Sequence, residues 1–241
     1  MNYIWKESWQ VRTPEVDFKA RIKPAEIFKL MQEAAEHSAD SLGVGLRYIT
    51  ENKVFWVLSR VNIRFFELPK QNDIITIETW PKGCNRLFAL RDFKIYNNDN
   101  LCAIATTSWL LLDAKTRKMT RLANFPGNNN VFAIEENAPK LRTKLSFNDC
   151  YAKKIQVCDL DVNNHVNNAR YIEWVMNTFN YDTYKSIKIN EIAINFISEM
   201  KYGDSTILRK TNVNNNEVYV AAINEHTDKQ STLTRIRFTH I

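Results

Sequence analysis

The segment "DFKARIKPAEIFKLM" (residues 17–31) aligns without a gap with "DVNNHVNNARYIEWV" (residues 161–175), which lies 144 positions further along the chain. A second pair, "RVNIRFFELPKQND" (residues 60–73) and "EIAINFISEMKYGD" (residues 191–204), aligns at a shift of 131 positions. The difference of 13 residues places an insertion between these two segments in the first half. Because two separate segments match in the same order, the sequence predicts two copies of one structural unit.

Each copy is predicted to contain one amphipathic helix followed by several strands. In the first copy the helix begins near Pro24, carries apolar residues at helical spacing and ends at Gly43. In the second copy a helix is predicted over residues 168–179. The strands are predicted from β-branched and aromatic runs separated by turn residues, over 54–66, 74–80, 87–96, 101–113, 187–197, 205–210, 217–224 and 231–240. This pattern indicates an α+β fold in which two antiparallel sheets each wrap around one helix.

The composition excludes several classes of protein. The 241 residues, 44% of them hydrophobic and 25% charged, are typical of a globular protein with an ample core. The sequence contains no GxGxxG or GxxxxGK[ST] phosphate-binding loop. The longest apolar runs, such as residues 108–112, are too short to cross a membrane. The N-terminus lacks the basic and then apolar order of a secretory signal, which favours a cytoplasmic location.

The net charge and the cysteine spacing limit which partners and cofactors are expected. The net charge of +6 favours an acidic partner, but no dense Lys and Arg cluster interleaved with aromatics predicts nucleic-acid binding. The four cysteines, Cys84, Cys102, Cys150 and Cys158, show no CxxC spacing. Neither a zinc site nor a disulfide framework is therefore expected, and the thiols are predicted to be free and buried. No cofactor and no metal ion are predicted.

The two copies differ in chemistry at the turn that precedes the helix. Three aligned positions form this turn in each copy: Asp161, Asn163 and His165 in the second, and Asp17, Lys19 and Arg21 in the first. Asp and Asn are common at helix starts, but a cap that the fold requires should look alike in both copies. The amide and the imidazole occur only once. The cluster in the second copy is therefore interpreted as a functional site.

These side chains suit the addition of water to an activated carbonyl. His165 can exchange a proton near neutral pH, and the amide of Asn163 can donate hydrogen bonds. Asp161 can orient the imidazole, and Glu199, which stands just before a turn, supplies a second carboxylate. Cys158 is close in sequence but precedes the turn, so a catalytic thiol is not favoured.

The motif "DLDVNNHVNNARYIEW" (residues 159–174) resembles the Asp-x-Asn-x-His-Val-Asn-Asn-x-x-Tyr motif of the acyl-acyl-carrier-protein (acyl-ACP) thioesterases, the plant plastid enzymes and their bacterial relatives. The resemblance runs over about residues 9–240 and includes "AAEHSADSLGVG" (residues 34–45). It implies two tandem hot-dog domains, each an antiparallel sheet wrapped around a long helix. It also implies hydrolysis of fatty acyl-ACP to free fatty acid and holo-ACP, with the acyl carrier protein as partner.

The resemblance extends to the catalytic residues. Asp161, Asn163 and His165 match the family's catalytic Asp, Asn and His, and Glu199 matches its strand carboxylate. The plant enzymes usually have Cys after that Glu, where this chain has Met200. Because Met cannot act as a thiolate nucleophile, a water-based or carboxylate-based mechanism is expected.

In the expected mechanism Glu199 activates water together with His165. Asn163 and backbone N–H groups at residues 166–168 stabilise the oxyanion, aided by the helix dipole. Asp161 either orients the Asn and His side chains or attacks as a nucleophile through an anhydride, and the sequence leaves both open.

The predicted domains are residues 1–124, an Asn-rich linker at 125–144, and residues 145–241. The second domain is expected to be catalytic, and the first to lack the catalytic set and to shape the acyl pocket. Candidate pocket residues lie on the first helix and on the strand behind it: Leu30, Met31, Ala34, Ala35, Trp56 and Leu58. Because the tandem chain already pairs two hot-dog units, either a monomer or a homodimer is expected. Candidate residues for docking the carrier protein are Lys201, Arg209 and Lys210.

Two rival functions share this scaffold. The first is an acyl-CoA thioesterase, which differs only in the carrier of the acyl group. The second is a non-catalytic module that binds acyl groups as a sensor, although a sensor need not keep all four catalytic candidates. A dehydratase is not favoured by the motif. The fold alone does not separate these functions.

Overall fold

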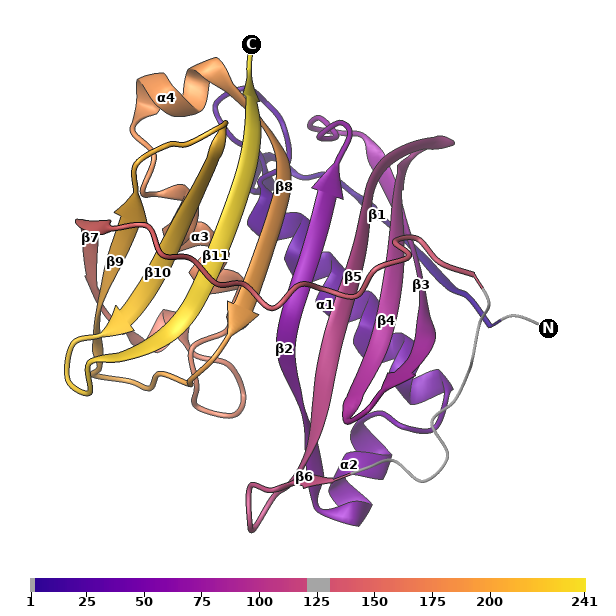
Figure 1. The fold of residues 1–241 in the computed structure, drawn as a ribbon. Helices are drawn as coiled ribbons and strands as arrows, with labels where there is room; N and C mark the ends of the chain where they lie inside the picture. The colour runs from indigo at the N-terminus through magenta and orange to yellow at the C-terminus, as the bar shows by residue number, and fades with distance from the viewer. Residues whose placement is uncertain (1–2, 121–130) are drawn as a thin grey trace. The chain divides into compact units, whose positions relative to one another are not determined.

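The computed structural model describes residues 3–120 and 131–241. The chain divides into two compact units, the first ending at Pro139 and the second beginning at Lys140. In each unit a helix packs against one face of an antiparallel sheet (Figure 1). The predicted α+β fold with two tandem hot-dog domains is thereby confirmed. Within the described ranges, no helix is both long enough and apolar enough to cross a membrane.

The N-terminal unit has a sheet in the order β1 (Trp5–Gln10), β3 (Ile74–Asn85), β4 (Phe88–Asn97), β5 (Asn100–Asp113) and β2 (Val54–Phe65), with β6 (Met119–Thr120) paired to β5. All these pairings are antiparallel. Helix α1 (Pro24–Ser41) begins with Pro, whose missing N–H would have no helical partner there. Gly43, between α1 and α2 (Leu46–Asn52), has a φ of 72°, which glycine adopts without strain.

Strand alternation determines which face of this sheet meets α1. Arg91 on β4 donates to Ser38 Oγ on α1 at 2.8 Å, so Asp92, the next residue, points to the opposite face. Burial of Arg91 lowers its pKa to about 10. The apolar core on the α1 side includes the following residues, which are at most 1% exposed: Ile27, Phe28, Met31, Ala34, Ile75, Ile77, Phe93 and Ile95.

The C-terminal unit repeats this plan with the strand order β8 (Ile187–Phe196), β11 (Lys229–His240), β10 (Glu217–Asn224), β9 (Ser205–Thr211) and β7 (Phe147–Lys154). Helix α3 (Asn168–Met176) has 9 residues against 18 in α1. It ends where polar residues cap it, since Asn177 is its C-cap and Asn180 is the N-cap of α4 (Tyr181–Ser186). Tyr171 on α3 contacts Phe196 at 6.0 Å between ring centroids, which places α3 on the Phe196 face of β8.

The predicted strands agree with the observed ones to within two residues, except that β3 extends beyond its predicted end at residue 80 to Asn85. β1, β6, β7, α2 and α4 were not predicted. β1 and β7 lie at sheet edges, where half-buried and exposed residues mix and no apolar run forms, and β6 has only two residues. The two helices bury no side chain. All four cysteines are free, as predicted, but only Cys102 is buried. The others are exposed, which corrects the expectation of buried thiols: they lie at a strand end, on edge strand β7 and in a turn.

Residues 125–130 of the predicted linker lie outside the described residues. Residues 131–136 cross the face of the N-terminal sheet opposite α1 (Figure 1). There the backbone of Ala133 donates to Asp92 Oδ2 at 2.9 Å, and Lys82 Nζ donates to the carbonyls of Ile134 and Glu136. The Lys82 and Asp92 side chains are 4% and 0% exposed and lie 3.6 Å apart. This buried ion pair fixes residues 133–136 onto the sheet.

A titratable contact joins β1 to α1. His37 Nδ1 lies 2.8 Å from Glu7 Oε2, and this hydrogen bond raises the pKa of His37 above 6.5. The pair therefore stabilises the folded unit fully below the unfolded pKa, and this contribution is lost as the pH rises through the folded pKa. The side chain of His37 is 42% exposed, so the stabilisation is small, below about 1 kcal/mol.

We expect the difference in unfolding free energy between the wild type and His37→Gln to be largest near pH 5.5 and to vanish by about pH 8.5. Urea denaturation at both pH values measures it. A difference that grows with pH would contradict the assignment.

Candidate active site

The motif loop, residues 160–166, is a tight turn between a 3₁₀ turn (Val157–Asp159) and α3. Asp161 N–H donates to His165 O at 2.8 Å, and Asn164 N–H donates to Asp161 O at 3.1 Å. Asn164 has a φ of 61°, in the left-handed region that Asn tolerates better than most residues. Local hydrogen bonds thus hold the loop that presents the motif side chains.

The Asp161 carboxylate organises this loop. Its Oδ1 accepts hydrogen bonds from Asn163 N–H at 2.8 Å and from His165 N–H at 3.1 Å. Short polar side chains commonly hold turns by such bonds to backbone N–H groups. The geometry supports a role for Asp161 in holding the loop.

The N-terminal unit contains the same loop without the motif chemistry. Asp17 Oδ1 accepts from Lys19 N–H at 2.8 Å and from Arg21 N–H at 3.1 Å. Ala20, aligned with Asn164, also has a positive φ, 56°. The Asp is therefore common to both copies as a loop residue, and the asymmetry between them lies at Asn163 and His165.

His165 and Glu199 meet because the motif loop pairs with the segment after β8. His165 forms an antiparallel bridge with Lys201, and Val166 N–H donates to Met200 O at 2.9 Å. The imidazole Nε2 then lies 3.3 Å from Glu199 Oε2. The two side chains are 19% and 35% exposed, so water can reach both. This arrangement pairs a proton acceptor with a group that can exchange a proton near neutral pH.

The corresponding positions of the N-terminal unit cannot form such a pair. Arg21 bridges Lys70 in the same way, but its side chain forms an ion pair with Asp17 at 3.2 Å. Leu68, aligned with Glu199, is buried. The carboxylate–imidazole pair is therefore a feature of the second copy.

The backbone donors expected for an oxyanion are largely occupied. Of the three N–H groups at residues 166–168, that of Val166 donates to Met200 O, and that of Asn167 donates to Asp159 O, each at 2.9 Å. The Asn167 side chain caps α3 by accepting from Ala169 N–H at 2.9 Å. Asn168 N–H, in the first turn of α3, is the remaining backbone candidate of the three. Asn163 is exposed on the loop.

The candidate acyl-pocket residues lie in two places in the N-terminal unit. Met31, Ala34 and Ala35 are buried along α1, and Leu30 on the same helix is half-buried. The other two, Trp56 and Leu58, lie on β2, the first half-buried and the second buried; Trp56 Nε1 donates to the carbonyl of Val44 at 3.0 Å, just beyond α1.

The alternative nucleophiles and ligands are placed as follows. Cys158 is exposed in the 3₁₀ turn, and Met200 is fully buried. Over the described part of the chain, no three His, Cys, Asp or Glu side chains gather as a metal site would require. Asp159 and Arg170 contact each other beside the motif loop and were not among the residues predicted from the sequence.

Substitutions of Asp161 test whether its carboxylate holds the motif loop or attacks the thioester as a nucleophile. If Asp161 holds the loop, Asp161→Asn keeps the Oδ1 acceptor and should retain kcat within about 5-fold, whereas Asp161→Ala should lower it by about 10- to 100-fold. If Asp161 attacks the thioester, Asn cannot replace it and both variants should be inactive. Steady-state thiol release measures kcat. Asp17→Ala, which removes the same bonds in the other unit, is the control and should leave kcat unchanged.

Comparison with protein families gives two consecutive matches. A model described as the acyl-ACP thioesterase N-terminal domain matches residues 2–124, and one described as the acyl-ACP thioesterase C-terminal domain matches residues 146–240. Together they span both copies of the repeat.

Similar individual proteins come from plants and bacteria. The chain is 25% identical over 230 residues to an oleoyl-acyl carrier protein thioesterase of Coriandrum sativum, covering 83% of this chain and 60% of that protein. It is 25% identical over 241 residues to oleoyl-acyl carrier protein thioesterase 2 of Arabidopsis thaliana, covering 90% and 65%. The chain thus spans less than two thirds of the length of these plant relatives.

The fold also matches a solved structure. An acyl-ACP thioesterase from Bacteroides thetaiotaomicron superposes with a TM-score of 0.87 at 22% identity, over 98% of each chain. This similarity supports the tandem hot-dog fold.

Proposed function

Because the chain belongs to the acyl-ACP thioesterase family, we propose that it hydrolyses the thioester of fatty acyl-ACP to free fatty acid and holo-ACP. The observation that carries this proposal is the contact of His165 Nε2 with Glu199 Oε2 at 3.3 Å, beside the motif loop. The pair is partly exposed and is formed in one copy of the repeat, as expected of a catalytic group. The fold alone would require no such pair.

In the proposed reaction Glu199 accepts a proton from water as the water oxygen attacks the thioester carbonyl. The resulting oxyanion accepts hydrogen bonds from the Asn163 amide and from Asn168 N–H at the positive end of α3. The carbon–sulfur bond then breaks, the electron pair leaves on the sulfur of the carrier, and His165 donates a proton to it. Asp161 holds the loop through its two backbone hydrogen bonds.

The two domains have different roles in this proposal. Residues 145–241 carry the catalytic side chains, residues 125–144 connect the domains, and residues 1–124 shape the acyl pocket. Buried residues of α1 are the main candidates for the pocket wall, because a fatty acyl chain requires apolar surroundings. Arg21 and Leu68 support the division, because they stand where the catalytic unit has His165 and Glu199.

The acidic carrier protein is the proposed partner, attracted by the net charge of +6. Of the three docking candidates, Lys201 is exposed and bridges His165. The other two are engaged elsewhere: Arg209 forms an ion pair with Asp149 at 2.7 Å, and Lys210 donates to Thr178 O. Burial lowers the pKa of Lys210. A cytoplasmic location and a monomeric or homodimeric state remain predictions from the sequence.

The experiment that tests this function is thiol release from palmitoyl-ACP and palmitoyl-CoA, measured side by side on the purified protein. His165→Ala is the control for a contaminating hydrolase. Faster release from palmitoyl-ACP, lost in the variant, supports the proposal. Faster release from palmitoyl-CoA would indicate an acyl-CoA thioesterase, and acyl binding without release from either substrate would indicate a sensor.

A further inference from the structure

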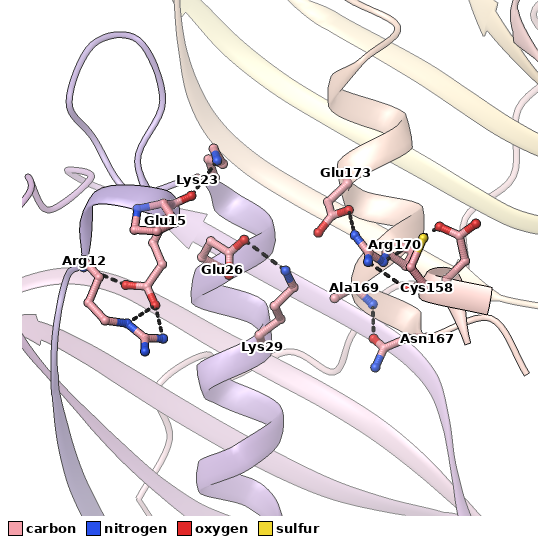
Figure 2. A network of polar contacts seen from close by, with 12 residues as sticks. Arg12, Glu15, Lys23, Glu26, Lys29, Cys158, Asn167, Ala169, Arg170 and Glu173 are labelled. Atoms are coloured by element: carbon pink, nitrogen blue, oxygen red, sulfur yellow. Dashed lines mark hydrogen bonds and ion pairs between the residues drawn. The ribbon is translucent and has the colours of Figure 1, made fainter. Parts of the chain in front are cut away.

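Arg170 is a cation in the first turn of α3, where the helix dipole disfavours positive charge. Its Nη2 donates to Cys158 O at 2.6 Å, and its Nη1 forms an ion pair with Glu173 Oε2 at 2.6 Å (Figure 2). Its Nε lies 3.8 Å from Asp159 Oδ1. One side chain therefore connects α3 to the 3₁₀ turn on the other side of the motif loop.

Asp159 is the buried centre of this connection, with a side chain 3% exposed. Its carboxylate accepts from Gln156 N–H at 2.9 Å and lies 3.0 Å from Lys153 Nζ. Its backbone carbonyl accepts from Asn167 N–H at 2.9 Å. Asp159 and Asn167 flank the motif loop on its two sides, so contacts that fix the 3₁₀ turn against α3 also fix the base of the loop that carries His165.

In the N-terminal unit a residue at a different position donates to the backbone carbonyl that is aligned with Cys158 O. The backbone carbonyl of Pro14, aligned with that of Cys158, accepts from Lys23 Nζ at 2.8 Å. Lys23 is aligned with Asn167, which in the second copy serves as the N-cap of α3. The position of Arg170 is occupied by Glu26, and that of Glu173 by Lys29. These two side chains also form an ion pair, at 2.9 Å, but the acidic and basic positions are exchanged. In both units a cationic side chain therefore fixes this turn. In the C-terminal unit the cation is Arg170, in the first turn of α3.

We propose that Arg170 is a positioning residue for the His165–Glu199 pair. By joining Cys158 O, Asp159 and Glu173, it holds the base of the motif loop against α3 and so sets the place of the imidazole relative to the carboxylate. It touches neither reacting group. A displacement of about 1 Å in a catalytic group is enough to lower turnover by up to 100-fold, so a partial release of the loop base is expected to be measurable. The kinetic part of this inference rests on the proposed function.

The first test compares Arg170→Gln, Arg170→Lys and the matched variant Lys23→Gln in the full chain. For palmitoyl-ACP, Arg170→Gln is expected to lower kcat on the order of 10-fold and to change KM less than about 2-fold. Arg170→Lys keeps one cation but not the fork that reaches several acceptors, so its kcat should lie between those of the wild type and Arg170→Gln. Lys23→Gln breaks the equivalent tie in the other unit and should leave kcat unchanged, although it can lower the Tm similarly.

The second test does not depend on hydrolysis. The imidazole of His165, identified among the four histidines by its loss in His165→Gln, is titrated by NMR. Its midpoint should shift in Arg170→Gln and stay the same in Lys23→Gln, because only the former moves the imidazole relative to Glu199. If the wild type releases no thiol, the proposed function fails and this titration still decides the positioning role. An unchanged midpoint in Arg170→Gln, or an equal loss of kcat in the Arg170→Gln and Lys23→Gln variants, would overturn the inference.

Discussion

Replacing His165 with alanine is expected to lower kcat for palmitoyl-ACP at least about 100-fold, the usual effect of losing a catalytic acid or base. In the proposed mechanism the imidazole protonates the leaving sulfur, and it lies 3.3 Å from the carboxylate of Glu199. Glu199→Gln should have an effect of the same size, because the amide keeps the shape of the side chain but cannot accept a proton from water. Thiol release at saturating substrate measures both.

The chain offers a control in the other copy of the repeat. Arg21→Ala removes the side chain aligned with His165 and its ion pair with Asp17, so it tests the loss of a loop contact without the loss of chemistry. Its kcat should equal that of the wild type. Because His165 and Glu199 act together in the proposed mechanism, the double variant should be little slower than either single variant. Near-wild-type turnover in both single variants would rule out the proposed mechanism.

The location of the candidate site could be predicted because the repeat supplied an internal comparison. Aligning Asp161–Asn163–His165 with the first copy showed that the imidazole and the amide are extra to the fold, and the strand alignment placed Glu199 opposite Leu68. Equivalent backbone hydrogen bonds occur at the aligned positions of the two copies, with the donors related by the first alignment and the acceptors by the second. Val166 N–H donates to Met200 O as Ile22 N–H donates to Pro69 O.

The roles of the backbone groups near the site could not be predicted. They depend on which N–H and C=O groups already form hydrogen bonds within the folded chain. The sequence could not show that the N–H groups of Val166 and Asn167 bond to Met200 and Asp159, because these partners come from hydrogen bonds across the turn. It also could not separate a catalytic from a loop-holding Asp161. One signal was available: Arg170 stands where the helix dipole disfavours a cation, and a charge in an unfavourable place usually has a specific partner.

Replacing Lys82 with methionine is expected to destabilise the N-terminal unit by about 3–5 kcal/mol, the range measured when one member of a buried ion pair is removed. Lys82 is 3.6 Å from Asp92, both are almost fully buried, and Lys82 also donates to the carbonyls of Ile134 and Glu136. The variant leaves the carboxylate of Asp92 buried without its cation and leaves two carbonyls without their donor. Urea denaturation near neutral pH measures the loss.

The pH dependence of this variant identifies Asp92 as the source of the loss. Burial raises the pKa of Asp92, and removal of Lys82 should raise it further, because the cation opposes that shift. A carboxyl whose folded-state pKa is raised binds a proton more tightly in the folded protein, so stability falls as the pH rises through the interval between the unfolded and folded values. Lys82→Met should therefore be less destabilising near pH 5 than near pH 7.

The double variant Lys82→Met/Asp92→Asn completes the argument. It removes both charges while the amide oxygen can still accept from Ala133 N–H, so it should recover a large part of the loss and lose the pH dependence. A single variant that costs less than about 1 kcal/mol would show that the pair contributes little to stability. The pair lies in the N-terminal unit, whereas the proposed catalytic residues lie in the C-terminal unit, so folded Lys82→Met should keep the wild-type kcat. The loss of stability without loss of turnover would assign the pair to holding residues 133–136 on the sheet.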